Sequence, residues 1–324
     1  MKRREFITLA GGLTMWPLEG QAQKSERIWR LGYIGTGGLG NQLWEEFTQK
    51  LDALGYVAGK NIIVTRSVVP PETKAIEVAL TKLHPEIDIL VIWGTVGGVV
   101  AKRLSQNIPV VFLSVGAPVD IGLVQSLPHP GGNMTGVSFE AAIDTYAKRL
   151  QMLKEVVPAL KRIAVLAAQG DPNVTFAMRS LEQAASGMHL EMTTTYVTAG
   201  DDLPAAFEEI RQRKIEGLIV IAGLLTSNNS RAIAELSLAY RLPSCHGFRE
   251  AVVAGGLISL GPDLFAIAKQ GAVYVDRIIR GAKPADLPVE QPDRYEIYIN
   301  LKTAKALGLE IPAHLLARAD KVVE

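Results

Sequence analysis

The sequence has little cysteine, no long apolar run and no excess of either charge. Its one cysteine, Cys245, excludes an intramolecular disulfide and a cysteine-rich metal site. There is no run of about 18 apolar residues, so we expect no membrane-spanning helix. The 34 basic side chains are balanced by 33 acidic ones and form no basic patch, so we expect no nucleic acid partner.

Motifs of common catalytic sites are also missing. The chain has no Gly-x-Ser-x-Gly elbow, no His-Glu-x-x-His pair and no phosphate loop that ends in Gly-Lys-Ser or Gly-Lys-Thr. Aspartate, histidine and serine are scattered along the chain and form no cluster. We therefore expect no metal site and no nucleophilic catalysis.

The first 24 residues have the pattern of a bacterial export signal. A basic start, "MKRRE", precedes the 13-residue apolar run "FITLAGGLTMWPL", and "EGQAQ" offers small residues for cleavage. Arg3-Arg4-x-Phe6-Ile7 also resembles a twin-arginine signal, and the sequence leaves the export route open. We predict a periplasmic protein and exclude residues 1–24 from the fold; the alternative reading is a frayed N-terminal helix.

The remaining chain reads as two successive arrays of alternating strands and helices. Its length of 324 residues favours about two domains, and short apolar runs between helical periods predict parallel sheets covered on both faces. No period of 20 to 50 residues repeats. Expected strands lie at 27–35, 61–69, 87–94, 108–115, 161–168, 188–197, 215–223, 242–247 and 255–261, and the chain closes with a long helix at 262–281, an antiparallel edge strand at 294–302 and a final helix.

The alternation stops at residues 114–138, "SVGAPVDIGLVQSLPHPGGNMTGVS". Prolines and glycines crowd this stretch, no long helix fits it, and it ends on the short strand-like "MTGVS". Such a break in mid-chain predicts an irregular connection between two lobes.

The stretch "LGYIGTGGLGN" contains Gly35-x-Gly37-x-x-Gly40, which has the spacing of a dinucleotide-binding turn. A turn of that kind also needs an acidic residue at the end of the second strand to bond the ribose. Here that strand ends on Arg66 and Ser67, and Arg66 would favour a 2′-phosphate. An exported NADP-dependent oxidoreductase is therefore the alternative hypothesis.

Longer motifs resemble one protein family. These are "PVVFLSVGAPVDIGLVQSLPHPGGNMTGVS", "QMLKEVVPALKRIAVL", "RLPSCHGFREAVVAGGLISLGPDL", "GAVYVDRIIRGAKPADLPVEQP" and "YINLKTAKALGLEIPAHLLARAD". In this order they resemble the bacterial ABC-transporter substrate-binding proteins of the tryptophan/tyrosine-binding type. The resemblance covers roughly residues 28–323.

The resemblance implies an α/β fold of the type I periplasmic-binding architecture, with two doubly wound parallel-sheet lobes joined by three crossings. Lobe 1 would comprise residues 28–138 plus 263–288, and lobe 2 residues 139–262 plus 293–324. The crossings would lie at 114–138, around Gly261 and at 284–292. The implied function is capture of a small molecule by a monomer, without cofactor or chemistry, and delivery to an ABC permease in the inner membrane. A ligand-sensing module for a membrane receptor would have the same fold.

Ligands of open parallel sheets bind beyond the carboxyl ends of the strands, so the residues there are the candidate contacts. Thr95, Asp171 and Asn173 could instead cap helices, Trp93 and Phe248 could be core residues, and His246 could bond a neighbouring carbonyl. Arg249 and Glu250 are interpreted as a solvated ion pair. The candidate ligand-binding residues are Thr36, Gly37, Trp93, Thr95 and Ser114 in lobe 1, and Gln169, Asp171, Asn173, Gly223, His246 and Phe248 in lobe 2.

One position departs from the family pattern. Relatives commonly carry an acidic residue before the proline that follows the fourth strand, and here Ala117 precedes Pro118. An acid there would suit a ligand ammonium. Its absence disfavours an ordinary α-amino acid and favours a carboxylate-bearing, uncharged or aromatic compound.

Overall fold

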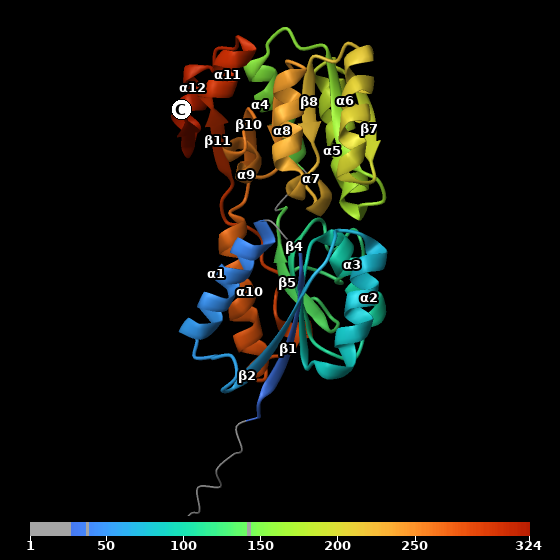
Figure 1. Ribbon diagram of the computed structural model, residues 1–324, viewed down its shortest axis with the longest axis vertical. Coiled ribbons are helices and arrows are strands. Elements are labelled where there is room, and N and C mark those ends of the chain that lie inside the picture. The colour runs from blue at the N-terminus through green and yellow to red at the C-terminus, as the bar shows by residue number, and fades with distance from the viewer. Residues whose placement is uncertain (1–26, 37–38, 141–143) are drawn as a thin grey trace, which may run out of the picture.

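The computed structural model describes residues 27–36, 39–140 and 144–324 and divides them into two α/β lobes stacked along the long axis (Figure 1). The predicted export signal and Gly37 lie outside the described residues. Among the helices of the described part, none is both long enough and apolar enough to span a membrane.

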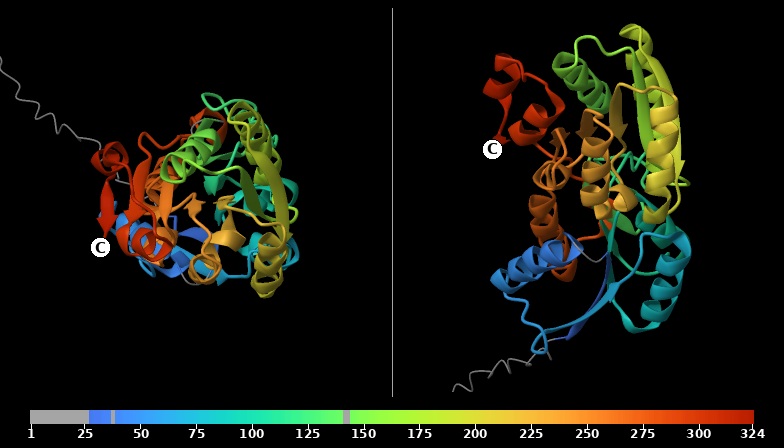
Figure 2. Two further views of the ribbon diagram at one scale, coloured as in Figure 1. Left: turned by 90° about the horizontal axis from the view of Figure 1, so that it is seen from above. Right: turned by 45° about the horizontal axis from the view of Figure 1, so that its top comes forward.

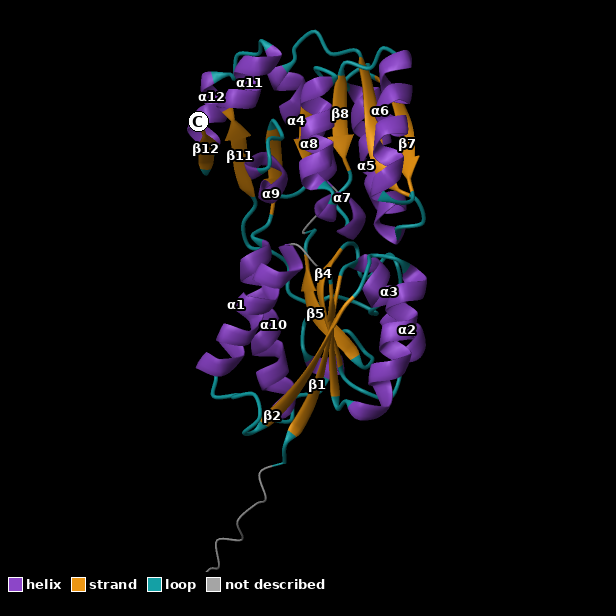
Figure 3. Cartoon of the chain, viewed as in Figure 1, coloured by secondary structure: helices purple, strands orange, loops and turns teal. Residues whose placement is uncertain are grey.

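Lobe 1 is built on a five-stranded parallel sheet in the order β2-β1-β3-β4-β5. Every residue of β3 and β4 is buried, as expected for strands covered by helices on both sides. Helices α1 and α10 pack against each other on one face, and α2 and α3 cover the other (Figure 3). The elements of this lobe are β1 (Trp29–Gly35), α1 (Leu39–Ala53), β2 (Ile62–Val68), α2 (Thr73–Leu83), η1 (His84–Glu86), β3 (Ile89–Trp93), α3 (Thr95–Leu104), β4 (Val110–Val115), β5 (Met134–Ser138), α10 (Leu264–Ile279) and η3 (Pro284–Asp286).

Lobe 2 is built on a seven-stranded sheet in the order β12-β11-β10-β9-β8-β6-β7. One core lies between this sheet and α4 and α5, and a second lies under α6 and α8. The tilted view in Figure 2 shows helices on both sides of this sheet as well. The elements are α4 (Asp144–Val156), β6 (Arg162–Ala168), α5 (Pro172–Gly187), β7 (Glu191–Val197), η2 (Gly200–Asp202), α6 (Leu203–Gln212), β8 (Gly217–Val220), α7 (Leu224–Asn228), α8 (Ser230–Ala239), β9 (Ser244–His246), α9 (Arg249–Val253), β10 (Ile258–Gly261), β11 (Glu296–Asn300), α11 (Leu301–Leu307), α12 (Ala313–Arg318) and β12 (Lys321–Val323).

The chain passes between the lobes three times, as predicted: after β5, between β10 and α10, and between α10 and β11. The placement of the first crossing at residues 114–138 was wrong. The end of that stretch forms β5, which pairs in parallel with β4 and completes the sheet of lobe 1. The stretch "MTGVS" is strand-like in the sequence, as expected, but five residues do not show which sheet such a strand joins.

The C-terminal end also differs from the prediction. Strand β11 is antiparallel to β10, as expected, but it is not an edge strand because β12 pairs with it in parallel on its outer side. The sheet of lobe 2 is therefore mixed. Pro312 and Gly308 interrupt the expected final helix, which the structure replaces by α11, α12 and β12.

Glycines allow the close approach of segments where the lobes join. Gly261 ends β10, and a Cβ atom there would lie 1.7 Å from the carbonyl oxygen of Gly247. Gly271 of α10 faces Leu113 of β4, where a Cβ would lie 2.7 Å from a methyl carbon. The return helix and the second crossing therefore depend on residues without side chains.

We predict that Gly261→Ala destabilises the protein by about 1–3 kcal/mol or more, because the Gly247 carbonyl belongs to the backbone and cannot move aside easily. Gly187→Ala is the control, since a Cβ at Gly187 meets nothing within 4 Å. Urea unfolding of both variants checks this. Equal midpoints for the two variants would show that the close approach is not a constraint.

Candidate functional site

A cavity opens between the two lobes, at the carboxyl ends of strands from both sheets. Its empty volume is about 540 Å³, a figure that includes the open solvent at its mouth, and ligand sites occur preferentially at interfaces of this kind between domains. The lining residues from lobe 1, with α10, are Tyr33, Gly35, Thr36, Leu39, Gly40, Leu43, Trp93, Gly94, Thr95, Ser114 and Leu264; those from the first crossing and lobe 2 are Phe139, Gly223, Leu224, Ser227, Asn228 and Phe248.

The two lobes touch across this cavity. The hydroxyl of Thr36, just after β1, lies 3.4 Å from Oδ1 of Asn228 on α7 and donates to it. Leu224 of α7 packs over Gly94, where a Cβ would come within 2.6 Å of a Leu224 methyl carbon. These contacts exist only while the lobes are together, so the structure represents a closed arrangement.

Ser114 owes its position to an irregular backbone. It has a φ of 55°, a left-handed conformation that non-glycine residues rarely adopt, and the pairing of β4 with β5 shifts register between Leu113 and Val115. Such a bulge turns a side chain out of its normal alternation. Here it places Ser114 in the wall of the cavity.

Aromatic rings form much of the remaining wall. Phe139 of the first crossing and Phe248 of lobe 2 meet edge to face, with centroids 5.6 Å apart. Trp93 ends β3, and Tyr33 lies in the buried second half of β1; burial raises the pKa of the Tyr33 phenol, so this hydroxyl stays neutral. The cavity therefore offers ring faces and edges to a flat ligand.

None of the described residues that line this cavity carries a charge. Its polar groups are hydroxyls, the Trp93 indole N–H, the Asn228 amide and the backbone near four glycines. Among the described residues, no group of three acids, histidines or cysteines could hold a metal ion. This wall can bind an apolar or aromatic body and hydrogen-bond a neutral group or a carboxylate.

The cavity unites Thr36, Trp93, Thr95, Ser114, Gly223 and Phe248 of the predicted site residues. Thr95 also accepts a hydrogen bond at 3.1 Å from the amide of Gly116.

Four predicted residues lie elsewhere. Gln169 and Asp171 line a different hollow at the lobe boundary, where Asp171 caps α5 by accepting a bond from the Asn173 amide. The Asn173 side chain is buried and donates to Tyr146 Oη at 3.0 Å and to the carbonyl of Ala222 at 2.9 Å. His246 lies 2.9 Å from the hydroxyl of Ser244, and burial lowers the pKa of its imidazole to about 4.

A second, smaller cavity adjoins the first. It has an empty volume of about 300 Å³, including its opening, and shares Leu39, Ser227 and Phe248 with the first. His246 and Glu250 belong to its wall. The solvated pair predicted at Arg249 and Glu250 was wrong, because both carboxylate oxygens of Glu250 are shielded from solvent.

The expected dinucleotide features are not assembled. The Arg66 guanidinium donates to Oδ1 of Asn41 at 2.6 Å and lies over the ring of Trp44. The Arg66 side chain thus packs on α1, and its positive charge lies against that helix. No acid stands at the end of β2.

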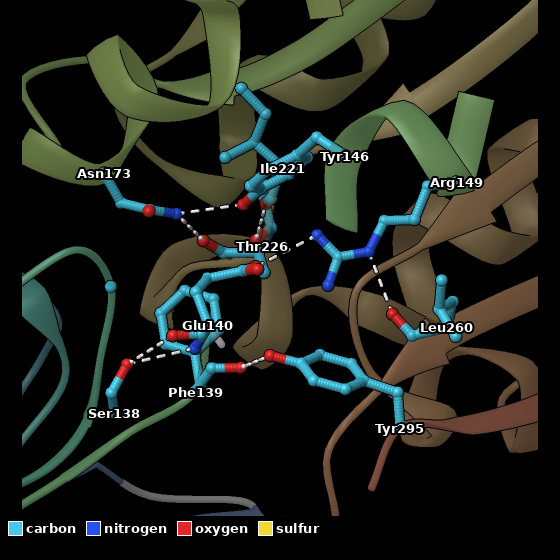
Figure 4. A network of polar contacts seen from close by, with 12 residues as sticks. Ser138, Phe139, Glu140, Tyr146, Arg149, Asn173, Ile221, Thr226, Leu260 and Tyr295 are labelled. Atoms are coloured by element: carbon cyan, nitrogen blue, oxygen red, sulfur yellow. Dashed lines mark hydrogen bonds and ion pairs between the residues drawn. The ribbon is translucent and has the colours of Figure 1, made fainter. Parts of the chain in front are cut away.

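The three crossings meet at a buried polar network (Figure 4). Arg149 of α4 is fully buried; its Nη1 lies 3.2 Å from Oε1 of Glu140, in the first crossing, and its Nε donates at 2.9 Å to the carbonyl of Leu260, next to the second. The third crossing joins through Tyr295, whose hydroxyl donates to the carbonyl of Phe139 at 2.9 Å. Gln291 donates to the Glu140 carbonyl at 3.1 Å.

Burial and the mutual attraction of the pair act in opposite directions on these two charges. Burial disfavours the charge of Arg149, but Glu140 together with the neighbouring Tyr146, Cys245 and Tyr295 outweighs it, and the pKa of the guanidinium is raised. Burial raises the pKa of Glu140, and the attraction of Arg149 opposes that rise. The Arg149 guanidinium also lies over the ring of Tyr146, 4.5 Å from its centroid.

Sequence reasoning missed several of these residues. Leu224, Ser227 and Asn228 lie on the short helix α7, whereas the stretch "TSNNSRAIAELSLAYR", from residue 226 onward, has the sequence pattern of one continuous helix. Arg149 had a visible signal: it shares a helix face with Thr145 and Met152, which are buried, and a charged residue on such a face requires a partner. Glu250 had no signal, since its burial depends on the packing of α9.

We predict that Arg149→Met destabilises the protein by about 3–5 kcal/mol, because Glu140 would be left buried without its partner. The double variant Arg149→Met/Glu140→Gln should lose less than the single one. Arg213→Met, which breaks an exposed pair with Glu209, is the control and should change little. Urea unfolding checks this; a double variant less stable than Arg149→Met would contradict the coupling.

The pKa of Asp171 predicts a pH-dependent effect. Burial raises this pKa from its ordinary value of 3.8 to about 6, although the hydrogen bond from the Asn173 amide acts to lower it. The folded state thus binds the proton more tightly than the unfolded state, and the stability from Asp171 is complete below pH 3.8 and lost as the pH rises through about 6.

We therefore expect Asp171→Asn, which keeps a capping oxygen, to be more stable than the parent by roughly 1–3 kcal/mol at pH 8 and equal to it near pH 4. Thermal or urea unfolding across this range measures the difference. Asp201→Asn, at an exposed acid of η2, is the control. A difference that is constant with pH would contradict the buried carboxylate.

Comparison with known proteins identifies the family. The model of the family described as ABC transporter substrate binding protein matches residues 42–323. The tyrosine-binding protein of Clostridioides difficile is 25% identical over 265 residues, which are 82% of this chain and 76% of that protein.

Solved structures agree on the fold. The ABC domain from Streptococcus pneumoniae in complex with L-Trp superposes with a TM-score of 0.84 at 20% identity, over 91% of this chain and all of that one. A conserved domain protein from Vibrio cholerae gives the same TM-score at 24% identity and the same coverage. These likenesses show the two-lobe periplasmic-binding-protein fold.

The match over most of the chain decides against the oxidoreductase hypothesis, because this family binds its substrates without chemistry. It also confirms the resemblance drawn from the sequence motifs. The chain belongs to the ABC transporter substrate-binding protein family, the extracytoplasmic binding proteins of these importers.

Proposed function

We propose that the protein captures a small molecule with an aromatic or flat apolar body in the interlobe cavity and delivers it to an ABC permease in the inner membrane. The observation that carries this proposal is the cavity itself. Both lobes contribute to its wall, and its wall combines four aromatic residues with neutral hydrogen-bonding groups. A ligand in this place would hold the two lobes together.

The residues divide by role. Trp93, Phe139 and Phe248 would contact the ring of the ligand, with Tyr33 and the leucines behind them. Thr36, Ser114 and Asn228 would bond its polar groups; Gly37, which is outside the described residues, remains a contact expected from the sequence alone. Thr95 and Gly223 complete the wall. Asn173, Asp171, Gln169 and His246 would support the surrounding loops from outside this cavity.

Two relatives bind aromatic amino acids according to their names, one tyrosine and the other L-Trp. Aromatic amino acids and related compounds are therefore the ligand class that we propose first. The uncharged wall suits their rings, and its hydroxyls and amide suit a carboxylate.

Closure would turn the lobes about the crossings that Arg149 anchors. Opening would break the Thr36–Asn228 contact and lift Leu224 from Gly94, and ligand contacts to both lobes would favour the closed state. The moving bodies would be lobe 1, residues 28–138 plus 263–288, and lobe 2, residues 139–262 plus 293–324. We propose that the protein acts as a periplasmic monomer, exported through the signal at residues 1–24.

We predict that an aromatic ligand stabilises the protein and that Trp93→Ala or Phe248→Ala weakens this binding about tenfold or more, because each loses a ring contact. A thermal-shift screen of aromatic amino acids, aromatic acids and aromatic amines finds the ligand, and calorimetry measures the variants. Tyr196→Ala, at an exposed ring of β7, is the control.

Two results would contradict the proposal. One is a screen in which no small molecule stabilises the protein while aliphatic and aromatic compounds are both represented. The other is a ligand whose affinity changes equally in Trp93→Ala and Tyr196→Ala.

A further inference from the structure

The second cavity ends at a carboxylate without a full partner. Both side-chain oxygens of Glu250 are shielded from solvent and have no hydrogen-bond partner among the described residues. The nearest cation is Arg249, whose Nε lies 3.5 Å from Oε1 of Glu250. The terminal nitrogens of Arg249 bond Glu296 at 2.7 Å and Asp263 at 2.8 Å. This arginine is therefore committed to two other acids.

Nothing else in the wall of this cavity supplies a positive charge. His246 is the only other titratable residue that lines it among the described residues, and its imidazole is neutral at physiological pH because burial holds its pKa near 4. The Thr226 hydroxyl donates to the carbonyl of Ile221 at 2.7 Å. A carboxylate shielded in this way is costly for the protein to maintain, and burial raises its pKa against the smaller opposing effects of its own backbone amide and of Arg249.

The carboxylate is within reach of the first cavity. Leu39, Ser227 and Phe248 line both cavities, and Phe248 precedes α9, on whose first turn Glu250 lies. A molecule whose ring packs on Phe248 can thus extend past Ser227 toward Glu250. The first cavity is thus aromatic and uncharged, and it adjoins the smaller second cavity, whose wall contains the carboxylate of Glu250.

We propose that Glu250 binds the ammonium group of the ligand, so that the protein takes aromatic compounds that carry a primary amine, with or without a carboxylate. This inference rests on the proposed function and specifies its ligand class. It also revises the expectation drawn from Ala117: the acid missing at that position is supplied by α9 from the opposite lobe. A structural role for Glu250 as the ion-pair partner of Arg249 is the competing explanation.

The stability of the ligand-free protein separates these two explanations. If Glu250 is an unpaired carboxylate that waits for a cation, Glu250→Gln removes a shielded charge, and the melting temperature at pH 7.5 should rise. If Glu250 stabilises Arg249, the same variant should melt at a lower temperature. Glu235→Gln, at an exposed acid of α8, is the matched control and should leave melting unchanged.

Binding of three indole compounds tests the ligand class. Tryptamine carries only the amine, indole-3-propionate only the carboxylate, and L-tryptophan both. By calorimetry, Glu250→Gln should weaken tryptamine and L-tryptophan about 10- to 100-fold, the effect of one charge-assisted hydrogen bond. Indole-3-propionate should bind the parent more weakly than tryptamine does and should bind parent and variant equally. Glu235→Gln should match the parent with all three.

Each other outcome overturns the inference. A lower melting temperature of Glu250→Gln, or an equal loss for all three compounds, assigns Glu250 a structural role. Tighter binding of indole-3-propionate than of tryptamine rejects the amine while the proposed capture of an aromatic ligand stands. If the parent binds none of the three compounds, the aromatic amine class is rejected. The proposal that the protein captures a ligand between its lobes is then tested separately by the wider thermal-shift screen.

Discussion

The structure depends on one buried arginine at the place where the chain changes lobes. Arg149 is removed from water, so its charge requires partners, and it finds them in the Glu140 carboxylate and the Leu260 carbonyl. Glu140 belongs to the first crossing and Leu260 lies at the end of β10, next to the second; Tyr295 adds the third through the neighbouring Phe139 carbonyl. When Arg149 and Tyr295 make all these contacts, the three crossings are held together at one place. The positions of both lobes depend on that place.

That common point lies beside the cavity. Phe139, which accepts the bond from Tyr295, is also an aromatic wall residue, and Glu140 follows it directly. The joint and the ligand cavity are therefore built from the same residues. A ligand that presses on Phe139 and Phe248 contacts the segments about which the lobes would turn. This arrangement gives a physical route from ligand contact to lobe closure.

Much of the architecture could be predicted from the sequence, because buried parallel strands and amphipathic helices each leave a periodic signal. Residues within three positions of the ends of β1, β3 and β8 were found in this way, and Thr36, Thr95 and Gly223 do line the cavity. The failures have common causes. Strand β5 is strand-like in the sequence, but its five residues do not show which sheet it joins, and the wall residues of α7 precede a helix break between Asn228 and Ser230 that the sequence pattern does not reveal. Glu250 is buried by tertiary packing, which leaves no local pattern.

The central claim is that two lobes turn about the Arg149 joint and close on a ligand. Fluorophores attached at Val99→Cys in lobe 1 and Tyr196→Cys in lobe 2, both at exposed positions, report the distance across the cleft, since Cys245 is buried and does not react. We expect a longer average separation in the ligand-free protein and a shorter, narrower one when the ligand found by screening is added. A single distance that is the same with and without bound ligand would contradict the account.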